Sequence, residues 1–158
     1  MSAIRYSAAA LLASALVAPG GTAHAPVGVG TVTHISDGDT IVVSTVAEPV
    51  RLLGIDAPED PADCGGPDAT HFATITLEGR EVTLTTDPTQ ASHDRYGRLL
   101  AYATLTDGTN YSVAAAEVGV VRAYTFEKPV QLAGEIAAAE QRAKSGGLGI
   151  WGPPCYAE

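Results

Sequence analysis

The residues of this chain that are best suited to chemistry are carboxylates and arginines, and they gather in three short segments. The segments are residues 36–40 (SDGDT), 51–59 (RLLGIDAPE) and 94–98 (DRYGR). Carboxylate oxygens are ligands for hard cations such as Ca²⁺, and a guanidinium is a planar fork that fits a phosphate. Each segment alone is explained as a hairpin turn or a solvated loop beside a strand. Together they predict a metal ion held beside a phosphate.

A closed set of strands would bring these segments to one rim. Alternating apolar and polar residues, β-branched runs and turn signals predict strands, whereas apolar spacing and capping residues predict helices. The predicted strands are 28–36, 40–45, 50–55, 81–86 and 99–105, and the predicted helices are 68–77, 112–117 and 129–144. Five short strands with a helix after the third favour an α+β, mainly β chain that forms a five-stranded barrel of the OB type with about three helices.

Local signals define the predicted helices. The first helix should bury Phe72 and Ile75 on one face, and Asn110 should cap the second. The third should begin at Pro129, because proline suits the first helical turn, and end at the glycine pair that starts at Gly146.

The first 25 residues are typical of a secretory signal peptide. Arg5 precedes an apolar run, residues 7–18, that is too short to span a bilayer, and small residues then fit cleavage after Ala23 or Ala25. We therefore expect residues 26–158 to be a single domain that is secreted to the extracellular medium. We also expect the mature chain to have no membrane segment and to be a monomer.

The charge balance argues against a broad nucleic-acid-binding face. The chain has 9 Lys and Arg against 18 Asp and Glu, for a net charge of −9, and loss of Arg5 with the signal makes the charge −10. Non-specific binding to nucleic acid normally depends on a basic surface. This composition favours local recognition of one or two phosphates, or no nucleic-acid partner at all.

The two cysteines, Cys64 and Cys155, are an even pair in a chain that we expect to be exported. In an oxidising compartment such a pair is most simply a disulfide, which would connect the loop after the acidic turn to the C-terminal tail. The alternative, a metal site with two cysteines, lacks further thiols and a suitably placed histidine.

Four motifs carry a resemblance to a known family. DGDT, RLLGIDAPE, DRYGRLLAY and GLGIWG, in this order and spacing, resemble the staphylococcal nuclease (thermonuclease) family over roughly the whole mature chain. The resemblance implies an OB barrel with three helices and a calcium-dependent phosphodiesterase that acts on DNA and RNA. It also implies that water attacks phosphorus and that the bond to the 5′ oxygen breaks, which leaves 3′-phosphate ends.

The resemblance also assigns the metal site and the catalytic carboxylate. Asp39 and Asp56 match the carboxylate ligands of Ca²⁺, and the main-chain carbonyl of Ala57 matches a further ligand. Glu59 matches the catalytic glutamate, which activates or positions the attacking water.

The substrate-binding residues follow in the same way. Arg51 and Arg98 resemble the pair that binds the scissile phosphate, and Tyr96 resembles the tyrosine that binds the terminal phosphate of the nucleotide. Tyr124 and Phe126 stand where the family has two tyrosines beside the base. Phe126 keeps the ring face that stacking requires but lacks a hydroxyl group.

Two other functions stay open at this point. One is a non-catalytic, secreted OB-fold module that binds nucleic acid, and the other is a secreted interaction domain that calcium stabilises. The presence of every charged catalytic position favours the enzyme over both. The acidic composition predicts salt-tolerant, weaker binding of long nucleic acid and a preference for single-stranded or frayed ends.

Overall fold

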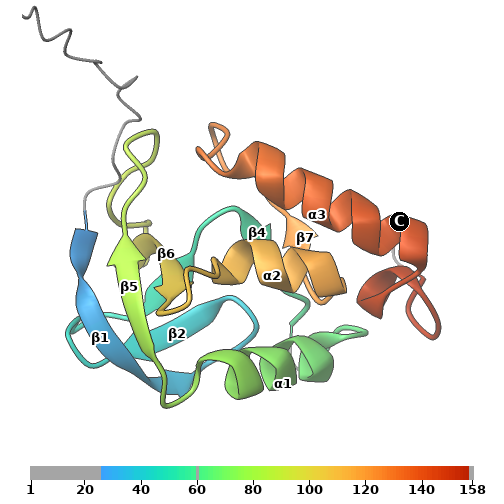
Figure 1. The fold of residues 1–158 in the computed structure, drawn as a ribbon, viewed down its shortest axis with the longest axis horizontal. Coiled ribbons are helices and arrows are strands. Elements are labelled where there is room, and N and C mark those ends of the chain that lie inside the picture. The colour runs from blue at the N-terminus through green and yellow to red at the C-terminus, as the bar shows by residue number, and fades with distance from the viewer. Residues whose placement is uncertain (1–25, 60, 157–158) are drawn as a thin grey trace, which may run out of the picture.

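The computed structural model describes residues 26–59 and 61–156, and its centre is a closed barrel of five strands (Figure 1). The predicted signal peptide, residues 1–25, lies outside the described residues. In chain order the elements are β1 (Pro26–Ile35), β2 (Thr40–Val43), β3 (Val50–Leu52), β4 (Ile55–Asp56), α1 (Gly66–Leu77), β5 (Glu81–Thr85), β6 (Leu99–Leu105), α2 (Tyr111–Val118), β7 (Arg122–Ala123), α3 (Ala133–Gly146) and the 3₁₀ turn η1 (Gly149–Trp151). The α+β fold with a five-stranded barrel and three α-helices confirms the fold predicted from the sequence.

The barrel closes in the order β1-β2-β3-β6-β5. The β3–β6 pair is parallel and the other neighbouring pairs are antiparallel. Because side chains alternate along a strand, each strand turns one set of residues inward. The inward set is aliphatic and fully buried, as at Ile41, Val43, Val50, Leu52 and Leu84. This interior gives the loops at the rim a rigid support.

The three helices cover one side and one end of the barrel. Figure 1 shows α2 between the barrel and α3, with α1 below them. The buried residues at the helix contacts are mostly alanines, among them Ala115 and Ala116 of α2 and Ala139 of α3. Small side chains let helix axes approach closely. Trp151 is buried with Ala143 at the end of α3, so the tail packs back onto the domain.

The structure corrects the predicted third strand. Instead of one strand over residues 50–55, the chain forms β3 and β4, and Gly54 between them has a φ of 80°. A side chain at Gly54 would collide with Ile136 of α3, so glycine allows both the turn and the close approach. β4 then pairs with β7, a two-residue strand that the sequence did not predict.

Two helix predictions were also wrong in part. The third helix begins at Ala133 rather than Pro129, because the segment before it is bound elsewhere: the Gln131 N–H donates to buried Asp87. In α1, Ile75 is 57% exposed, and the fully buried residues on the inner face include Ala69, Ala73 and Leu77. Asn110 caps α2, and Gly147 ends α3, as the sequence predicted.

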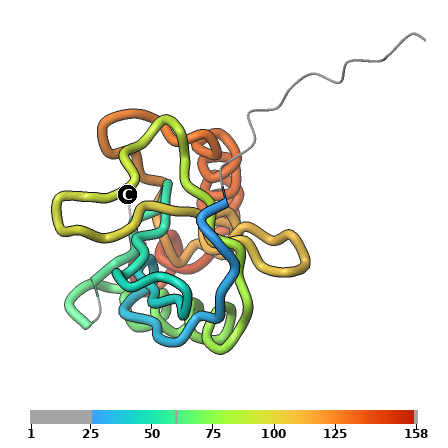
Figure 2. Tube along the Cα trace, turned by 90° about the vertical axis from the view of Figure 1, so that its left-hand side faces the viewer, coloured from blue at the N-terminus to red at the C-terminus, as the bar shows by residue number. Residues whose placement is uncertain are grey.

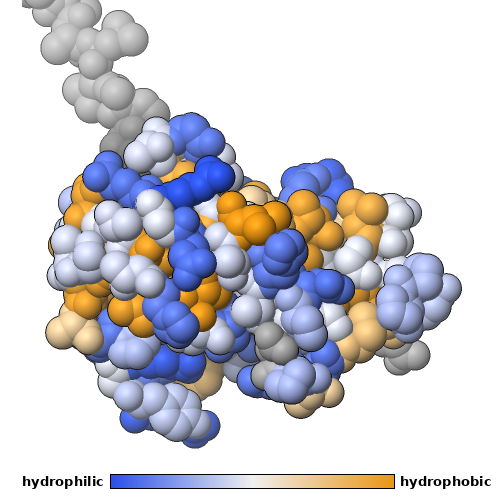
Figure 3. All heavy atoms as spheres, turned by 90° about the horizontal axis from the view of Figure 1, so that it is seen from below, coloured by the Kyte–Doolittle hydropathy of each residue, from blue (hydrophilic) through white to orange (hydrophobic). Residues whose placement is uncertain are grey.

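A disulfide joins Cys64 to Cys155, with their Cα atoms 5.6 Å apart. It connects the loop before α1 to the tail after η1, which is the pairing that the sequence favoured. No helix among the described residues is both long enough and apolar enough to cross a membrane. On the face shown in Figure 3, hydrophobic residues form several separate groups between hydrophilic ones.

Candidate active site

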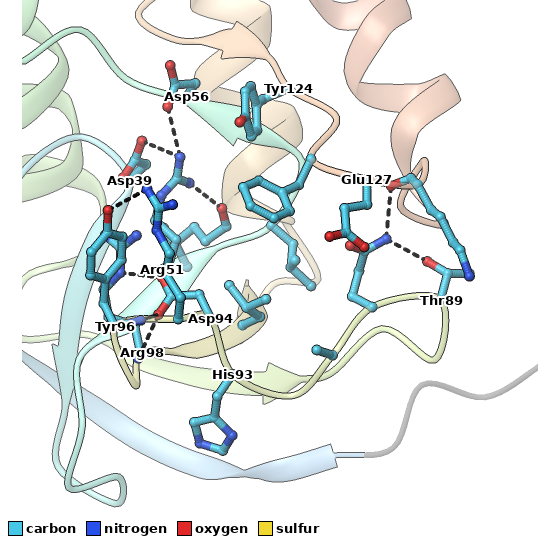
Figure 4. Close-up of a pocket in the computed structure, with 18 of the residues that line it drawn as sticks. Asp39, Arg51, Asp56, Thr89, His93, Asp94, Tyr96, Arg98, Tyr124 and Glu127 are labelled. Atoms are coloured by element: carbon cyan, nitrogen blue, oxygen red, sulfur yellow. Dashed lines mark hydrogen bonds and ion pairs between the residues drawn. The ribbon is translucent and has the colours of Figure 1, made fainter.

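The three charged segments meet beside the barrel, in an open cleft of about 770 Å³ (Figure 4). Strand pairing brings them together. Thr40 of β2 lies opposite Arg51 of β3, and Arg51 pairs in turn with Leu100 of β6. Asp39 directly precedes β2, and Arg98 directly precedes β6. The register of three core strands therefore places a carboxylate and two guanidinium groups at one rim.

Arg51 is held in a fixed orientation by four acceptors. Its Nη1 donates to the carbonyl oxygens of Leu52 and Ile55, at 2.8 Å each. Its Nη2 lies 2.9 Å from Asp56 Oδ1 and 3.1 Å from Asp39 Oδ2. The side chain is only 13% exposed, so these charge-assisted contacts are partly shielded from water. The guanidinium is held firmly, and four of its five N–H groups already have acceptors, so Nη2 can meet an anion only when Asp39 and Asp56 release it.

Asp39 is the buried carboxylate of the cleft, at 6% exposure. Burial raises its pKa to about 6, although the Arg51 guanidinium and the Ala57 N–H, which donates to Oδ2 at 2.7 Å, both act to lower it. The turn that carries Asp39 is held in place by Tyr111 of α2, whose buried hydroxyl donates to the Gly38 carbonyl at 2.9 Å. Tyr111 was not among the residues predicted to build the site.

The carboxylates of Asp39 and Asp56 are the candidate ligands for a metal ion. One oxygen of each lies within 3.1 Å of Arg51 Nη2, so the two carboxylates face the same place, which a guanidinium nitrogen fills in this structure. Within the described ranges no three Asp, Glu, His or Cys side chains gather as a metal-binding group. Ca²⁺ also accepts backbone carbonyls and water as ligands, so the two carboxylates are a partial ligand set that such groups would complete.

Arg98 is oriented by Asp94, a residue of the third charged segment to which the sequence assigned no role. Arg98 Nε donates to Asp94 Oδ2 at 2.7 Å, and the backbone N–H groups of Arg98 and Tyr96 donate to Oδ1. Burial acts to raise the pKa of Asp94, but these hydrogen bonds outweigh it and lower the pKa. The opposite charges of Asp94 and Arg98, four residues apart, were the sequence signal that could have indicated this ion pair.

Three exposed aromatic rings line the cleft. The Tyr96 ring is 68% exposed and lies under two guanidinium groups, 4.8 Å from Arg95 and 5.5 Å from Arg98. The Tyr124 and Phe126 rings are tilted, with centroids 6.4 Å apart, and their faces are accessible for stacking.

The structure brings eight of the nine residues predicted for the active site to the cleft, all except Ala57. The side chains that line the cleft are those of Asp39, Arg51, Asp56, Glu59, Tyr96, Arg98, Tyr124 and Phe126. Ala57 contacts the site through its N–H, which donates to Asp39, rather than through the carbonyl predicted as a metal ligand, and Glu59 is an exposed residue of the cleft. The arrangement can bind a phosphodiester between cations, place a carboxylate beside it, and hold a neighbouring base against the aromatic rings.

The far end of the cleft was not predicted. It is formed by Thr89, Gln90, Glu127 and Lys128, from two loops that lie side by side (Figure 2). Gln90 Nε2 donates to the Lys128 carbonyl at 3.0 Å, and the Thr89 hydroxyl, which donates to Asp87 Oδ1 at 2.7 Å, lies 3.2 Å from the Pro129 carbonyl. Residues about 40 positions apart share no motif or period, so no sequence signal indicates this contact.

Comparison with known proteins agrees with this geometry. The family model described as "Staphylococcal nuclease homologue" matches residues 49–153. The chain is 33% identical over 127 residues to a Thermonuclease of Staphylococcus intermedius, covering 76% of this chain and 74% of that protein. It is 37% identical over 130 residues to an uncharacterized Bacillus anthracis protein and 34% identical over 128 residues to Endonuclease YncB of Bacillus subtilis.

The matches cover 77% and 76% of this chain, respectively, but only 60% of each of those two Bacillus proteins. The family match nevertheless spans well over half of the chain, from β3 to the tail, and includes most of the cleft. This chain belongs to the staphylococcal nuclease homologue family.

Proposed function

We propose that this protein is a secreted, calcium-dependent nuclease that hydrolyses phosphodiester bonds of DNA and RNA. It cleaves the bond to the 5′ oxygen and leaves 3′-phosphate ends. The observation that carries the proposal is the convergence of two carboxylates, two oriented guanidinium groups and a third, exposed carboxylate in one cleft of a nuclease-family fold. Two of the relatives, whose names are Thermonuclease and Endonuclease YncB, support the same reaction class.

The charge of the cleft supports a role for a divalent cation. Among its described lining residues, four carry a Lys or Arg charge and six carry a carboxylate. A polyanion would therefore meet net negative charge in the cleft unless a cation offset it. Asp39, Asp56 and the Ala57 carbonyl would hold Ca²⁺, which supplies positive charge beside the scissile phosphate.

The side chains of the cleft have separate roles in the proposed reaction. Arg51 and Arg98 bind the equatorial oxygens of the phosphate and stabilise the charge that grows on them during attack. Glu59 lies at the exposed edge, where it can orient a water molecule and accept its proton. Asp94 orients Arg98, and the carbonyls of Leu52 and Ile55 hold Arg51 Nη1, so Nη2 is the arm that would turn to the phosphate once Ca²⁺ took up Asp39 and Asp56.

Secretion is proposed from residues 1–25, and it suits a weak calcium site. Extracellular calcium modules work with dissociation constants of roughly 10⁻⁴ to 10⁻³ M. A site built from two carboxylates, a carbonyl and water is in keeping with that range. The acidic composition and the confined site in the cleft favour single-stranded or frayed substrate ends over long duplexes.

The test is hydrolysis of single-stranded DNA by residues 26–158 in millimolar CaCl₂ or in chelator, for the wild type, Glu59→Gln and Glu81→Gln. Glu81 is an exposed β5 residue outside the cleft, so it is a matched control for the loss of one carboxylate. We expect calcium-dependent cleavage that is lost in Glu59→Gln and kept in Glu81→Gln. Mass spectrometry of the fragments should find 3′-phosphate ends.

A contrary result would separate the proposed enzyme from the alternatives. Binding of single-stranded DNA without cleavage in any condition would indicate a nucleic-acid-binding module. Calcium-dependent melting without nucleotide affinity would indicate a calcium-stabilised interaction domain. Full activity of Glu59→Gln would remove Glu59 from the mechanism.

A further inference from the structure

The cleft extends beyond the groups that the proposed reaction needs. Figure 4 shows Asp39, Arg51, Tyr96 and Arg98 at one end and Glu127 and Thr89 at the other, with Tyr124 drawn between these two groups. A substrate with its phosphate at the charged end and its base on the aromatic rings would point the free edge of that base toward the far end. The far end is therefore placed to read base identity.

The far end of the cleft is held in a fixed conformation by buried hydrogen bonds. Asp87, which is 2% exposed, accepts hydrogen bonds from both the backbone and the hydroxyl of Thr89, from the Tyr102 hydroxyl, and from the Gln131 N–H, at 2.7 to 2.9 Å. These contacts fix the loop after β5 against the segment before α3. Gln90 spans the same two loops through the Lys128 carbonyl. A preorganised surface can discriminate between bases because little ordering energy is lost on binding.

Glu127 places a carboxylate at this surface, where it can accept hydrogen bonds from a base. It lines the cleft directly after Phe126, it is exposed, and no ion pair is recorded for it among the described residues. An ionised carboxylate only accepts hydrogen bonds. It therefore favours a base edge that carries adjacent donors and disfavours one that carries carbonyl oxygens.

We propose that Glu127 determines base preference, favouring guanine over thymine and uracil at the base subsite of the cleft. The Watson–Crick edge of guanine presents an N1–H and an N2 amino group side by side, which match the two oxygens of a carboxylate. Adenine and cytosine present one amino donor beside an acceptor. Thymine and uracil present one N–H between two carbonyls, which the carboxylate repels. This inference rests on the proposed nuclease function, because it assumes that a nucleotide occupies the cleft.

The test is cleavage of a random-sequence pool of single-stranded DNA in CaCl₂, with the base on each side of every cut counted by sequencing. We expect guanine to be enriched over thymine by about fivefold at one flanking position, which is the low end for a bidentate contact because Glu127 is exposed. In Glu127→Gln, whose amide offers both a donor and an acceptor, the ratio should fall below about twofold.

The ratio is the informative quantity, because removal of a negative charge raises affinity for every nucleotide alike. Glu135→Gln makes the same charge change on exposed α3 surface outside the cleft, and should leave the ratio unchanged. A thymine preference in the wild type, or an unchanged ratio in Glu127→Gln, would overturn the assignment.

A binding measurement separates this inference from the proposed function. Calorimetric titration with deoxyguanosine and thymidine 5′-monophosphates should show the tighter binding of the guanine nucleotide in the wild type alone. If no oligonucleotide is cleaved but this difference is found, the nuclease proposal fails and the role of Glu127 stands. If neither nucleotide binds, the role of Glu127 fails as well.

Discussion

The stability of this fold should depend strongly on one buried carboxylate, that of Asp87. Its two oxygens accept four hydrogen bonds, two each, and bind together the loop after β5, strand β6 and the segment before α3. Asp87→Asn keeps the size and shape of the side chain but replaces one acceptor oxygen with an NH₂ donor. Wherever that NH₂ group points, it faces two groups that donate to Asp87 in the wild type, so two of the four bonds are lost.

The magnitude follows from the kind of bond. A hydrogen bond to a charged group contributes about 1.5–3 kcal/mol, and the two remaining bonds become neutral ones. Partial rotation of the Tyr102 hydroxyl recovers part of the loss. We expect the free energy of unfolding to fall by about 3 kcal/mol. With a urea m-value of about 2 kcal/mol/M, the midpoint of unfolding should fall by about 1.5 M.

The same carboxylate gives the effect a pH dependence. Burial acts to raise the pKa of Asp87, but the hydrogen bonds from Gln131, Thr89 and Tyr102 outweigh burial and lower it. The folded chain therefore binds fewer protons here than the unfolded chain, whose Asp pKa is about 3.9. The stabilisation is complete above that value and is lost as the pH falls through the folded pKa. The stability difference between wild type and Asp87→Asn should shrink accordingly below about pH 4.

The assay is urea unfolding of both proteins at pH 7 and at several values between pH 5 and 2.5. Asp107→Asn is the matched control, because Asp107 makes the same kind of bond to the Thr109 N–H in an exposed turn and should change stability by less than about 1 kcal/mol. An Asp87→Asn loss no larger than that of Asp107→Asn, or one that persists unchanged at pH 2.5, would refute the reasoning.

Three further predictions concern the site, the helix packing and the disulfide. Arg51→Lys should lower kcat/KM about 100-fold or more, since one ammonium cannot replace a two-armed contact; kinetics on single-stranded DNA with Arg80→Lys as control would test it. Gly119→Ala should lower the free energy of unfolding by about 1–2 kcal/mol for its left-handed backbone conformation, and further because the new methyl group would clash with the Leu148 backbone after α3. Gly108→Ala should lower it by the conformational part alone, and thermal unfolding of both variants would measure the difference. Cys64→Ser should lower the free energy of unfolding by up to about 4–5 kcal/mol. Reduction of the disulfide in the wild type should lower the urea midpoint of unfolding to that of Cys64→Ser.

The barrel was predictable because its signals are local. β2 is the β-branched run TIVV, and the turn before it is marked by Asp-Gly-Asp, so periodicity and turn residues define both ends. The charged end of the cleft was predictable for a related reason. Asp39 and Arg98 each stand directly before a barrel strand, so the strand order places them once the fold is known.

The rest depends on tertiary contacts that leave no mark in a short window. β4 and β7 have two residues each, which is too few for any period to be visible, and they exist because Gly54 turns the chain against Ile136. The start of α3 was misplaced because Pro129 is a good first helical residue, yet the following backbone donates to Asp87. Ile75 was misassigned because alanines form the narrow contact face of α1.

The two ends of the cleft are held in place by different means, and this has a consequence for how the site can vary. The charged end is fixed by the register of β2, β3 and β6, so its residues can change chemically without moving the core. The far end is fixed by Asp87, which is itself part of the interior. Substitutions at Glu127 should therefore alter base preference at little cost in stability, whereas any substitution that frees the loop from Asp87 should loosen base discrimination and the fold together.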